Sequence, residues 1–228
     1  MIGNCSADVV SSTVPCSNKW MIGTVNSFFI GFTSTFIATT LGTMAALGLS
    51  RPHMPYKGLI MAILISPMIV PLIITAAGMF FFYARVNLVY TFTGVILAHV
   101  ALATPFVVIT VTATLVGFDM NMVKASQSLG AKPMRTFFKV IMPLILPGII
   151  SGALFAFITS FDEVVIVMFM ASLDQLTIPK QMWAGIRQEI SPVILCMATC
   201  LVALSIFLLT TVELLRRRSE KLRGIKAR

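Results

Sequence analysis

Two adjacent carboxylates, Asp162 and Glu163, stand inside a long apolar stretch that runs from Leu144 to Ala171. Ionisable side chains are costly within a lipid-facing segment, so they usually face a cavity, water or a partner charge. Successive residues of a helix point about 100° apart, so the two carboxylates cannot face the same spot. They could bind a cation, or they could pair with Lys180 or Arg187 at a membrane surface for structural reasons alone.

The other reactive side chains do not form a catalytic or metal-binding set. His99 is alone in an apolar segment, without a second ligand at metal-binding spacing, so we expect a packed or hydrogen-bonded histidine. Cys196 and Cys200 are four residues apart in an apolar segment, a spacing typical of packing. Cys5 and Cys16 lie in a polar N-terminal stretch and could form a disulfide if that stretch lies outside the cytoplasm. The sequence also has no phosphate-binding Gly-Lys loop, so we expect neither an enzyme nor a bound cofactor.

The composition indicates that these residues belong to a membrane protein. The chain has 228 residues, of which 57% are hydrophobic and only 11% charged, and its mean hydropathy is +0.96. The charges gather in short clusters between apolar runs of about 18 residues or more, which is the pattern of transmembrane helices. The net charge of +9 does not indicate nucleic-acid binding, because no basic patch is interleaved with aromatic residues.

Five apolar segments are long enough to cross the ~30 Å hydrocarbon core at about 1.5 Å per helical residue. We therefore predict an all-α membrane protein, a bundle of five transmembrane helices. The first segment is rich in small residues, which let helices approach closely in lipid. Pro67 and Pro71 kink the second, and unwound backbone beside Ser66 could line a solute path. The segments are Val25–Leu49, Leu59–Tyr83, Leu88–Val116, Leu144–Ala171 and Pro192–Leu215.

The distribution of Lys and Arg predicts the orientation of the chain. If the linkers alternate between the two sides, most of the 17 basic residues fall on one side. That side holds Arg51, Lys57, the polar stretch 117–143 and a basic tail, and by the positive-inside rule it faces the cytoplasm. The N-terminus then lies outside and the C-terminus inside. The other side holds only Lys19, Arg85, Lys180 and Arg187. The chain divides into a polar N-terminal segment (1–20), a transmembrane domain (21–216) and a basic cytoplasmic tail (217–228).

The polar stretch 117–143 is expected to form two short amphipathic helices. Asp119 suits the N-cap of the first, and Gly130 falls where a left-handed glycine commonly ends a helix. Pro133 can open the second helix at its first turn, and Pro143 lacks the N–H that would continue it. One face of the first helix recurs at helical spacing through Met122, Ala125, Ser126 and Leu129.

This stretch resembles the cytoplasmic "EAA" loop of ABC-importer permeases. That loop has a Glu-Ala-Ala, a glycine four positions after the last alanine, and an apolar-x-Leu-Pro ending. LGA at Leu129–Ala131 and GFD at Gly117–Asp119 fit as well, but Lys124 occupies the position of the family's glutamate. The matching residues, all at the family spacing, are Lys124, Ala125, Ser126, Gly130, Val140, Met142 and Pro143.

The resemblance implies that the first amphipathic helix is a coupling helix, which docks in a groove on a cytoplasmic ATPase subunit. Closure of two ATPases would push on it and tilt the spans between inward- and outward-facing states. The resemblance also implies a second permease subunit, a periplasmic or extracellular substrate-binding protein and a bacterial inner membrane, with ATP hydrolysed by another chain. It further implies contact with membrane lipid and no binding of nucleic acid. The coupling residues would be Asp119, Lys124, Ala125, Ser126, Leu129, Gly130 and Pro143.

Within that family, the chain resembles the spermidine/putrescine-type permeases through SFDEVV (Ser160–Val165) and TIPKQMW (Thr177–Trp183). Two carboxylates beside an otherwise uncharged route favour a cationic solute, in agreement with this resemblance. We expect Asp162 to face the solute path, and Glu163 to face the partner permease or the outer surface. The alternatives are a permease for another solute, such as an amino-acid derivative, and a truncated membrane scaffold that does not transport, because the usual family member has six spans.

Overall fold

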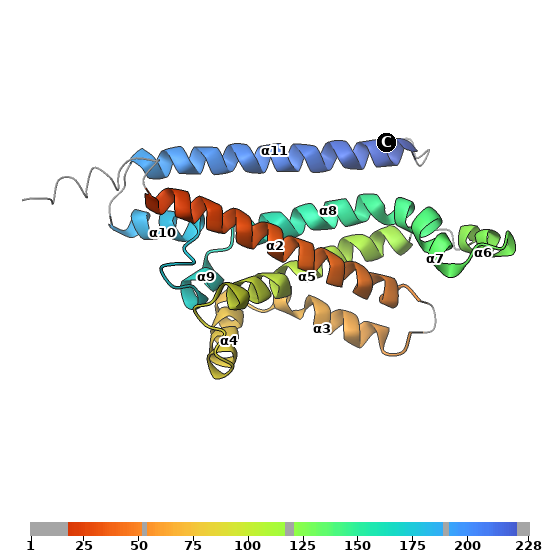
Figure 1. Cartoon of the computed structure of the whole chain (residues 1–228), viewed down its shortest axis with the longest axis horizontal. Coiled ribbons are helices and arrows are strands. Elements are labelled where there is room, and N and C mark those ends of the chain that lie inside the picture. Colours follow the sequence, from red (N-terminus) through yellow and green to blue (C-terminus); the bar gives the residue numbers. More distant parts are fainter. Residues whose placement is uncertain (1–17, 52–53, 117–120, 189–191, 223–228) are drawn as a thin grey trace, which may run out of the picture.

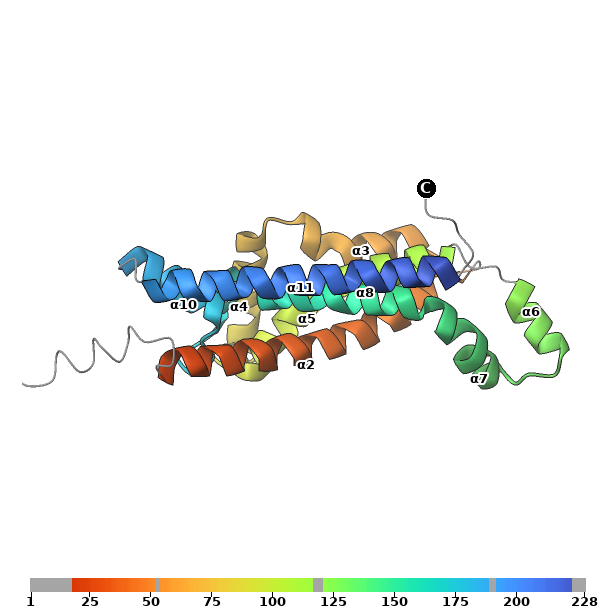
Figure 2. The same cartoon turned by 90° about the horizontal axis from the view of Figure 1, so that it is seen from above.

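The computed structural model describes residues 18–51, 54–116, 121–188 and 192–222, and all regular structure in these ranges is helical. The prediction of an all-α protein is therefore confirmed. Most of the long helices lie along one axis of the molecule, as Figures 1 and 2 show. The helices are α2 (Asn18–Leu49), α3 (Lys57–Ile69), α4 (Leu72–Arg85), α5 (Phe92–Val116), α6 (Asn121–Ser128), α7 (Pro133–Thr136), the π-helical turn η1 (Phe137–Ile141), α8 (Met142–Phe161), α9 (Val165–Met170), α10 (Ile178–Gln188) and α11 (Pro192–Leu222).

Within the described ranges, four segments are long and apolar enough to cross a membrane as single helices. They lie in α2, α5, the continuous run Pro133–Phe161 and α11. The fifth predicted span is instead the pair α3 and α4, which is bent by 103°. Pro71 explains this bend, because a proline disfavours helical backbone in the residue before it, and Val70 is extended (φ −70°, ψ 136°). Pro67 stays inside α3. The predicted five spans are therefore obtained only if the bent pair counts as one.

The core is formed by α2, α5 and α8, which pack more extensively than any other elements. Small side chains make this close approach possible, since Ala38, Ala98 and Ala156 have no exposed surface. A methyl group added at Gly42 of α2 would lie only 2.7 Å from the Cβ of Val107 on α5. The predicted role of small residues in helix packing is therefore confirmed for the first span.

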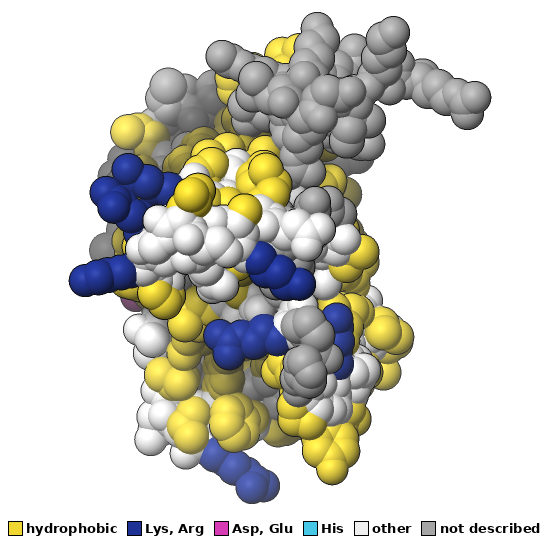
Figure 3. Space-filling view, turned by 90° about the vertical axis from the view of Figure 1, so that its right-hand side faces the viewer, with side chains coloured by type: hydrophobic (Ala, Val, Ile, Leu, Met, Phe, Trp, Pro, Cys, Tyr) yellow, Lys and Arg dark blue, Asp and Glu magenta, His cyan; other side chains and the backbone are white. Residues whose placement is uncertain are grey.

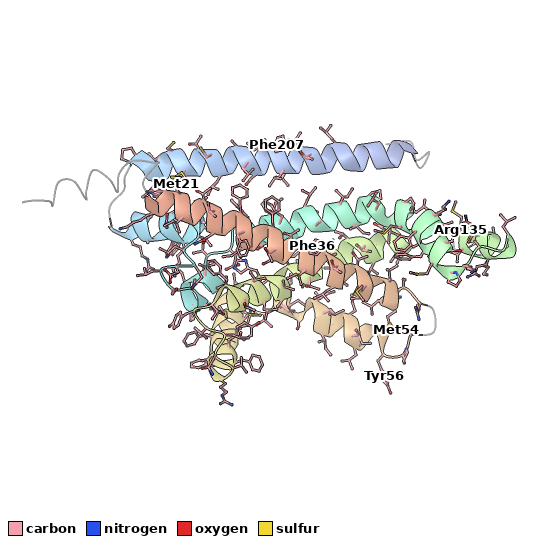
Figure 4. All side chains as sticks on the ribbon, viewed as in Figure 1. Met21, Phe36, Met54, Tyr56, Arg135 and Phe207 are labelled. Carbon is pink, nitrogen blue, oxygen red and sulfur yellow. The ribbon has the colours of Figure 1, made fainter. Side chains whose placement is uncertain are left out.

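The outer surface of the bundle is strongly apolar. Only 6% of the span Ile194–Thr211 in α11 is buried, although α11 lies along α8. Phe36 on α2 and Phe207 on α11 are 76% and 67% exposed, and Figure 4 labels both. Such a surface suits lipid or the helices of another membrane subunit. Cys196 and Cys200 are exposed on the same helix, so the expectation that they pack within this chain is wrong.

The fourth predicted span does not continue as one helix. α8 ends at Phe161 with Asp162 as its C-cap, and the separate six-residue helix α9 follows. Glu163, which precedes the N-cap residue Val164, stabilises the start of α9, because its Oε1 accepts a hydrogen bond from the backbone N–H of Ile166 at 3.0 Å. The two carboxylates therefore lie in a break between helices rather than on one continuous helix.

Candidate functional site

The first short helix, α6, ends in the turn that its glycine predicts. Gly130 has a φ of 78°, in the left-handed region that favours glycine. Its N–H donates to the carbonyl of Gln127 at 2.9 Å, and the N–H of Ala131 donates to that of Ser126 at 3.1 Å. These two bonds form a Schellman motif, which satisfies the last carbonyls of the helix. The predicted left-handed C-terminal glycine is confirmed.

The second short helix begins as predicted but does not end at Pro143. Pro133 is in the first turn of α7, and the run from there through η1 and α8 is continuous. The N–H of Met142 bonds to the carbonyl of Phe137, five residues earlier, as in a π-helix. This wider turn accommodates Pro143, which has no N–H for the carbonyl four residues before it. The chain therefore enters the long span without the expected second break.

Most of the predicted docking face of α6 is open to its surroundings. Met122 and Leu129 are 49% and 88% exposed, although both are large apolar residues. Lys124 and Ala125 are exposed as well. Figure 2 shows α6 projecting beyond the end of the bundle. Asp119, the predicted N-cap, lies outside the described residues.

Ser126 has a different environment from the rest of this face. Its hydroxyl lies 3.0 Å from the hydroxyl of Thr136 on α7, and it donates to the carbonyl of Val123 at 2.8 Å. Thr136 is only 3% exposed. Ser126 therefore joins the two short helices from within, which differs from its predicted place on the docking face.

The end of the molecule that carries α6 is rich in basic side chains. Figure 3 shows this end, where several Lys and Arg side chains project among hydrophobic and other side chains. The turn between α2 and α3 lies at the same end, as the labels for Met54, Tyr56 and Arg135 in Figure 4 show. The start of α2 and α10 lie at the opposite end (Figure 1). Among the described residues, the exposed basic side chains at this end, which we call the basic end, are Arg51, Lys57, Lys124, Lys132, Arg135 and Lys139.

Asp162 and Glu163 line a hollow of about 430 Å³ between α8, α9 and the start of α4. Glu163, together with Thr159 and Leu72, also lines a second hollow of about 350 Å³. The bend between α3 and α4 lines that second hollow. The break between α8 and α9 lines the first, so two interruptions of helical backbone border the pair of hollows. Such backbone is tolerated at membrane depth where it lines a cavity. We call the two hollows together the acidic cavity, because the two carboxylates are the only ionisable groups among the described residues that line it.

The two carboxylates have different environments. Asp162 is exposed, whereas Glu163 is only 8% exposed and bonds to Ile166. We expected Glu163 to face the partner permease or the outer surface, whereas within this chain it is buried against the start of α9. The ammonium of Lys180 donates not to Glu163 but to the backbone carbonyls of Val167 and Ala171, at 3.2 and 3.0 Å. Partial burial lowers the pKa of this ammonium from its usual value.

Other residues that the sequence singled out lie outside the acidic cavity. Ser66 is exposed and donates to the carbonyl of Ile63 at 2.8 Å, and it lines neither hollow. His99 is buried, with Nδ1 2.8 Å from the hydroxyl of Ser160, as expected for a hydrogen-bonded core histidine. The sequence could not indicate this partner, because the two residues are 61 positions apart. Arg187 stacks on Trp183, 5.5 Å from the ring centroid, and the described part of the chain has no group of three side chains that could hold a metal ion.

A match to a known protein family shows which class of protein this chain is. Residues 38–221 match the family described as "Binding-protein-dependent transport system inner membrane component". The chain belongs to this family. It is therefore a membrane permease rather than an enzyme, and the expected importer permease is confirmed.

The relatives agree with this permease assignment, and a solved structure shares the fold. The spermidine/putrescine transport system permease protein PotC of Haemophilus influenzae is 29% identical over 195 residues, covering 86% of this chain and 76% of that protein. The putrescine transport system permease protein PotI of Escherichia coli is 36% identical over 103 residues, covering 45% of this chain and 37% of that protein. A solved structure of the MetNI methionine ABC transporter aligns with a TM-score of 0.67 at 20% identity, over 93% of this chain and 99% of that chain. This last similarity confirms the predicted fold.

Proposed function

We propose that this permease imports polyamines such as spermidine and putrescine. The observation that carries the proposal is the acidic cavity, whose described lining offers two carboxylates and no basic group. The names of the relatives PotC and PotI support the same class of solute. Each hollow lies within the range of small-molecule sites, roughly 300–1,000 Å³.

In this proposal Asp162 contacts the solute directly. It is exposed, whereas the carboxylate of Glu163 is already bonded to backbone. An ammonium group of the solute would bind Asp162 through a charge-assisted hydrogen bond. The apolar side chains of Leu72 and Val165 line the same hollow and suit the methylene groups between two ammonium groups.

The energy for transport comes from other subunits in this proposal. The exposed Met122 of α6 and Leu129 directly after it would fill an apolar groove on a cytoplasmic ATPase, with Lys124 and Ala125 beside them. Gly130 and the π-helical turn before Pro143 would connect that contact rigidly to α8. The complete importer would contain a second permease subunit, two ATPases and a binding protein outside, in the inner membrane of a bacterium. The basic end would face the cytoplasm.

A charge-removal variant tests the proposed solute contact. Asp162→Asn keeps the side-chain shape but removes the charge, so it should reduce polyamine uptake by about tenfold or more while basal ATPase activity and assembly persist. The matched control is Asp174→Asn, which changes an exposed carboxylate outside the acidic cavity and should leave uptake within about twofold. Uptake by reconstituted vesicles measures both. Equal losses in uptake, assembly and basal activity would instead show that Asp162 is structural.

A further inference from the structure

The short helix α9 is held by charged side chains at both ends. It is six residues long and apolar, and Ile166, Val167 and Met170 have no exposed surface. At its first turn, the carboxylate of Glu163 accepts the N–H of Ile166. At its last turn, the ammonium of Lys180, on α10, donates to the carbonyls of Val167 and Ala171. A negative charge at the start and a positive charge at the end of a helix both complement its dipole.

These contacts form a continuous chain from α10 to the acidic cavity. Lys180 binds the last turn of α9, α9 binds Glu163 through Ile166, and Glu163 lines both hollows. The N–H of Tyr90 donates to the carbonyl of Met170 at 2.9 Å and holds the same end of α9. α9 also packs against α4 and α5 (Figure 1). A displacement of α9 would therefore move the wall of the cavity.

We propose that Lys180 is a positioning residue for transport: by holding the last turn of α9, it fixes the two carboxylates on the wall of the acidic cavity. This proposal rests on the proposed function of that cavity. It differs from direct pairing of Lys180 with Asp162 or Glu163, because the two acceptors of its ammonium are backbone carbonyls of α9 and its C-cap. Removing the ammonium takes this donor from the carbonyl of Ala171, whereas the carbonyl of Val167 still accepts the N–H of Ala171 at 3.0 Å. The end of α9 should then loosen at its C-cap.

Amide hydrogen exchange of α9 tests, without any solute, whether Lys180 holds the last turn of this helix. In the assembled complex, Lys180→Met should raise exchange in the peptide covering 164–172 by about tenfold or more, because hydrogen bonds to a charged donor are lost. Lys180→Arg keeps a cation and donors and should restore most of the protection. The matched control is Arg187→Met, which removes a cation from the same helix but one that contacts Trp183 rather than α9. It should leave exchange in this peptide unchanged.

A second readout separates positioning from packing alone. Lys180→Met should reduce solute-stimulated ATPase activity severalfold while basal activity and assembly stay near the wild-type values. The double variant Lys180→Met with Glu163→Gln should be no better than Lys180→Met alone, since the two side chains hold opposite ends of α9.

Three results would overturn this proposal. The first is unchanged exchange in Lys180→Met, or an equal increase in Arg187→Met. The second is increased exchange with normal solute-stimulated ATPase activity, which would show that the contact of Lys180 with α9 is structural only. The third is rescue by Glu163→Gln, which would show direct pairing of the two charges. If no polyamine stimulates the wild-type complex, the proposed solute is wrong, whereas the exchange comparison still decides whether Lys180 holds α9.

Discussion

Single residues set the ends of the short helices at both candidate sites. Gly130 ends α6 because it adopts a positive φ, and two backbone bonds across the turn satisfy the last carbonyls. Glu163 begins α9 by accepting the N–H of Ile166, which leaves Asp162 as the exposed acid of the pair. In each case the chemistry of one residue determines where a functional segment can point.

Substituting Gly130 should uncouple transport from ATP hydrolysis. Gly130→Val places a β-branched residue at a φ of 78°, which strains the turn by about 1–3 kcal/mol, although an added Cβ meets nothing within 4 Å. We expect the chain to insert normally but to bind its ATPase more weakly, as measured by co-purification. The control is Gly58→Val in α3, where the site is equally open and the backbone is not left-handed. Normal ATPase binding by the Gly130 variant would contradict the role of the turn.

The helix ends that sequence predicted correctly depend on local backbone bonding. Gly130 and Pro133 act through backbone bonds that reach only a few positions, so their neighbours in sequence suffice to place them. Ser126 and Glu163 were placed differently from the prediction, and the open alternative of a carboxylate paired with Lys180 is not what its hydrogen bonds show, because these partners depend on how α7, α9 and α10 fold back. Helical spacing alone cannot indicate such partners.

At the scale of elements, hydropathy predicted where the apolar segments lie, whereas the interruption of the second segment was predicted from its prolines and the other breaks were not predicted. The bend of 103° between α3 and α4 and the break between α8 and α9 both fall inside stretches that read as single apolar spans. Pro71 explains the first, and Glu163 stabilises the start of the new helix at the second. The π-helical turn η1 similarly replaced a predicted end at Pro143. Average hydropathy carries no information about any of these three features.

Reporter fusions should show whether the bent pair α3 and α4 crosses the membrane as one span. If it does, a reporter active only outside the cytoplasm works after Asn87 and after Gln175, and is silent after Lys132 or Arg217. The basic end predicts this pattern through the positive-inside rule. A re-entrant pair would instead leave the Asn87 fusion silent, and activity after Lys132 would contradict the orientation of α6.

At the scale of the whole molecule, the two candidate sites lie at different points along its long axis. The basic end carries α6, whereas the acidic cavity lies where α8 gives way to α9 and α3 bends into α4. The continuous run Pro133–Phe161 connects the two, since it begins at α7 and ends beside Asp162. Displacement of α6 by an ATPase could therefore reach the cavity through one rigid helix.

The most direct test of the account is whether a polyamine drives the assembled importer. The chain would be purified with its co-expressed partners in lipid nanodiscs, and ATP hydrolysis would be measured with the binding protein loaded in turn with spermidine, putrescine or methionine. We predict severalfold stimulation by at least one polyamine and none by methionine, together with loss of that stimulation in Asp162→Asn. Stimulation by methionine alone, or an equal response to every solute, would contradict the proposed polyamine path.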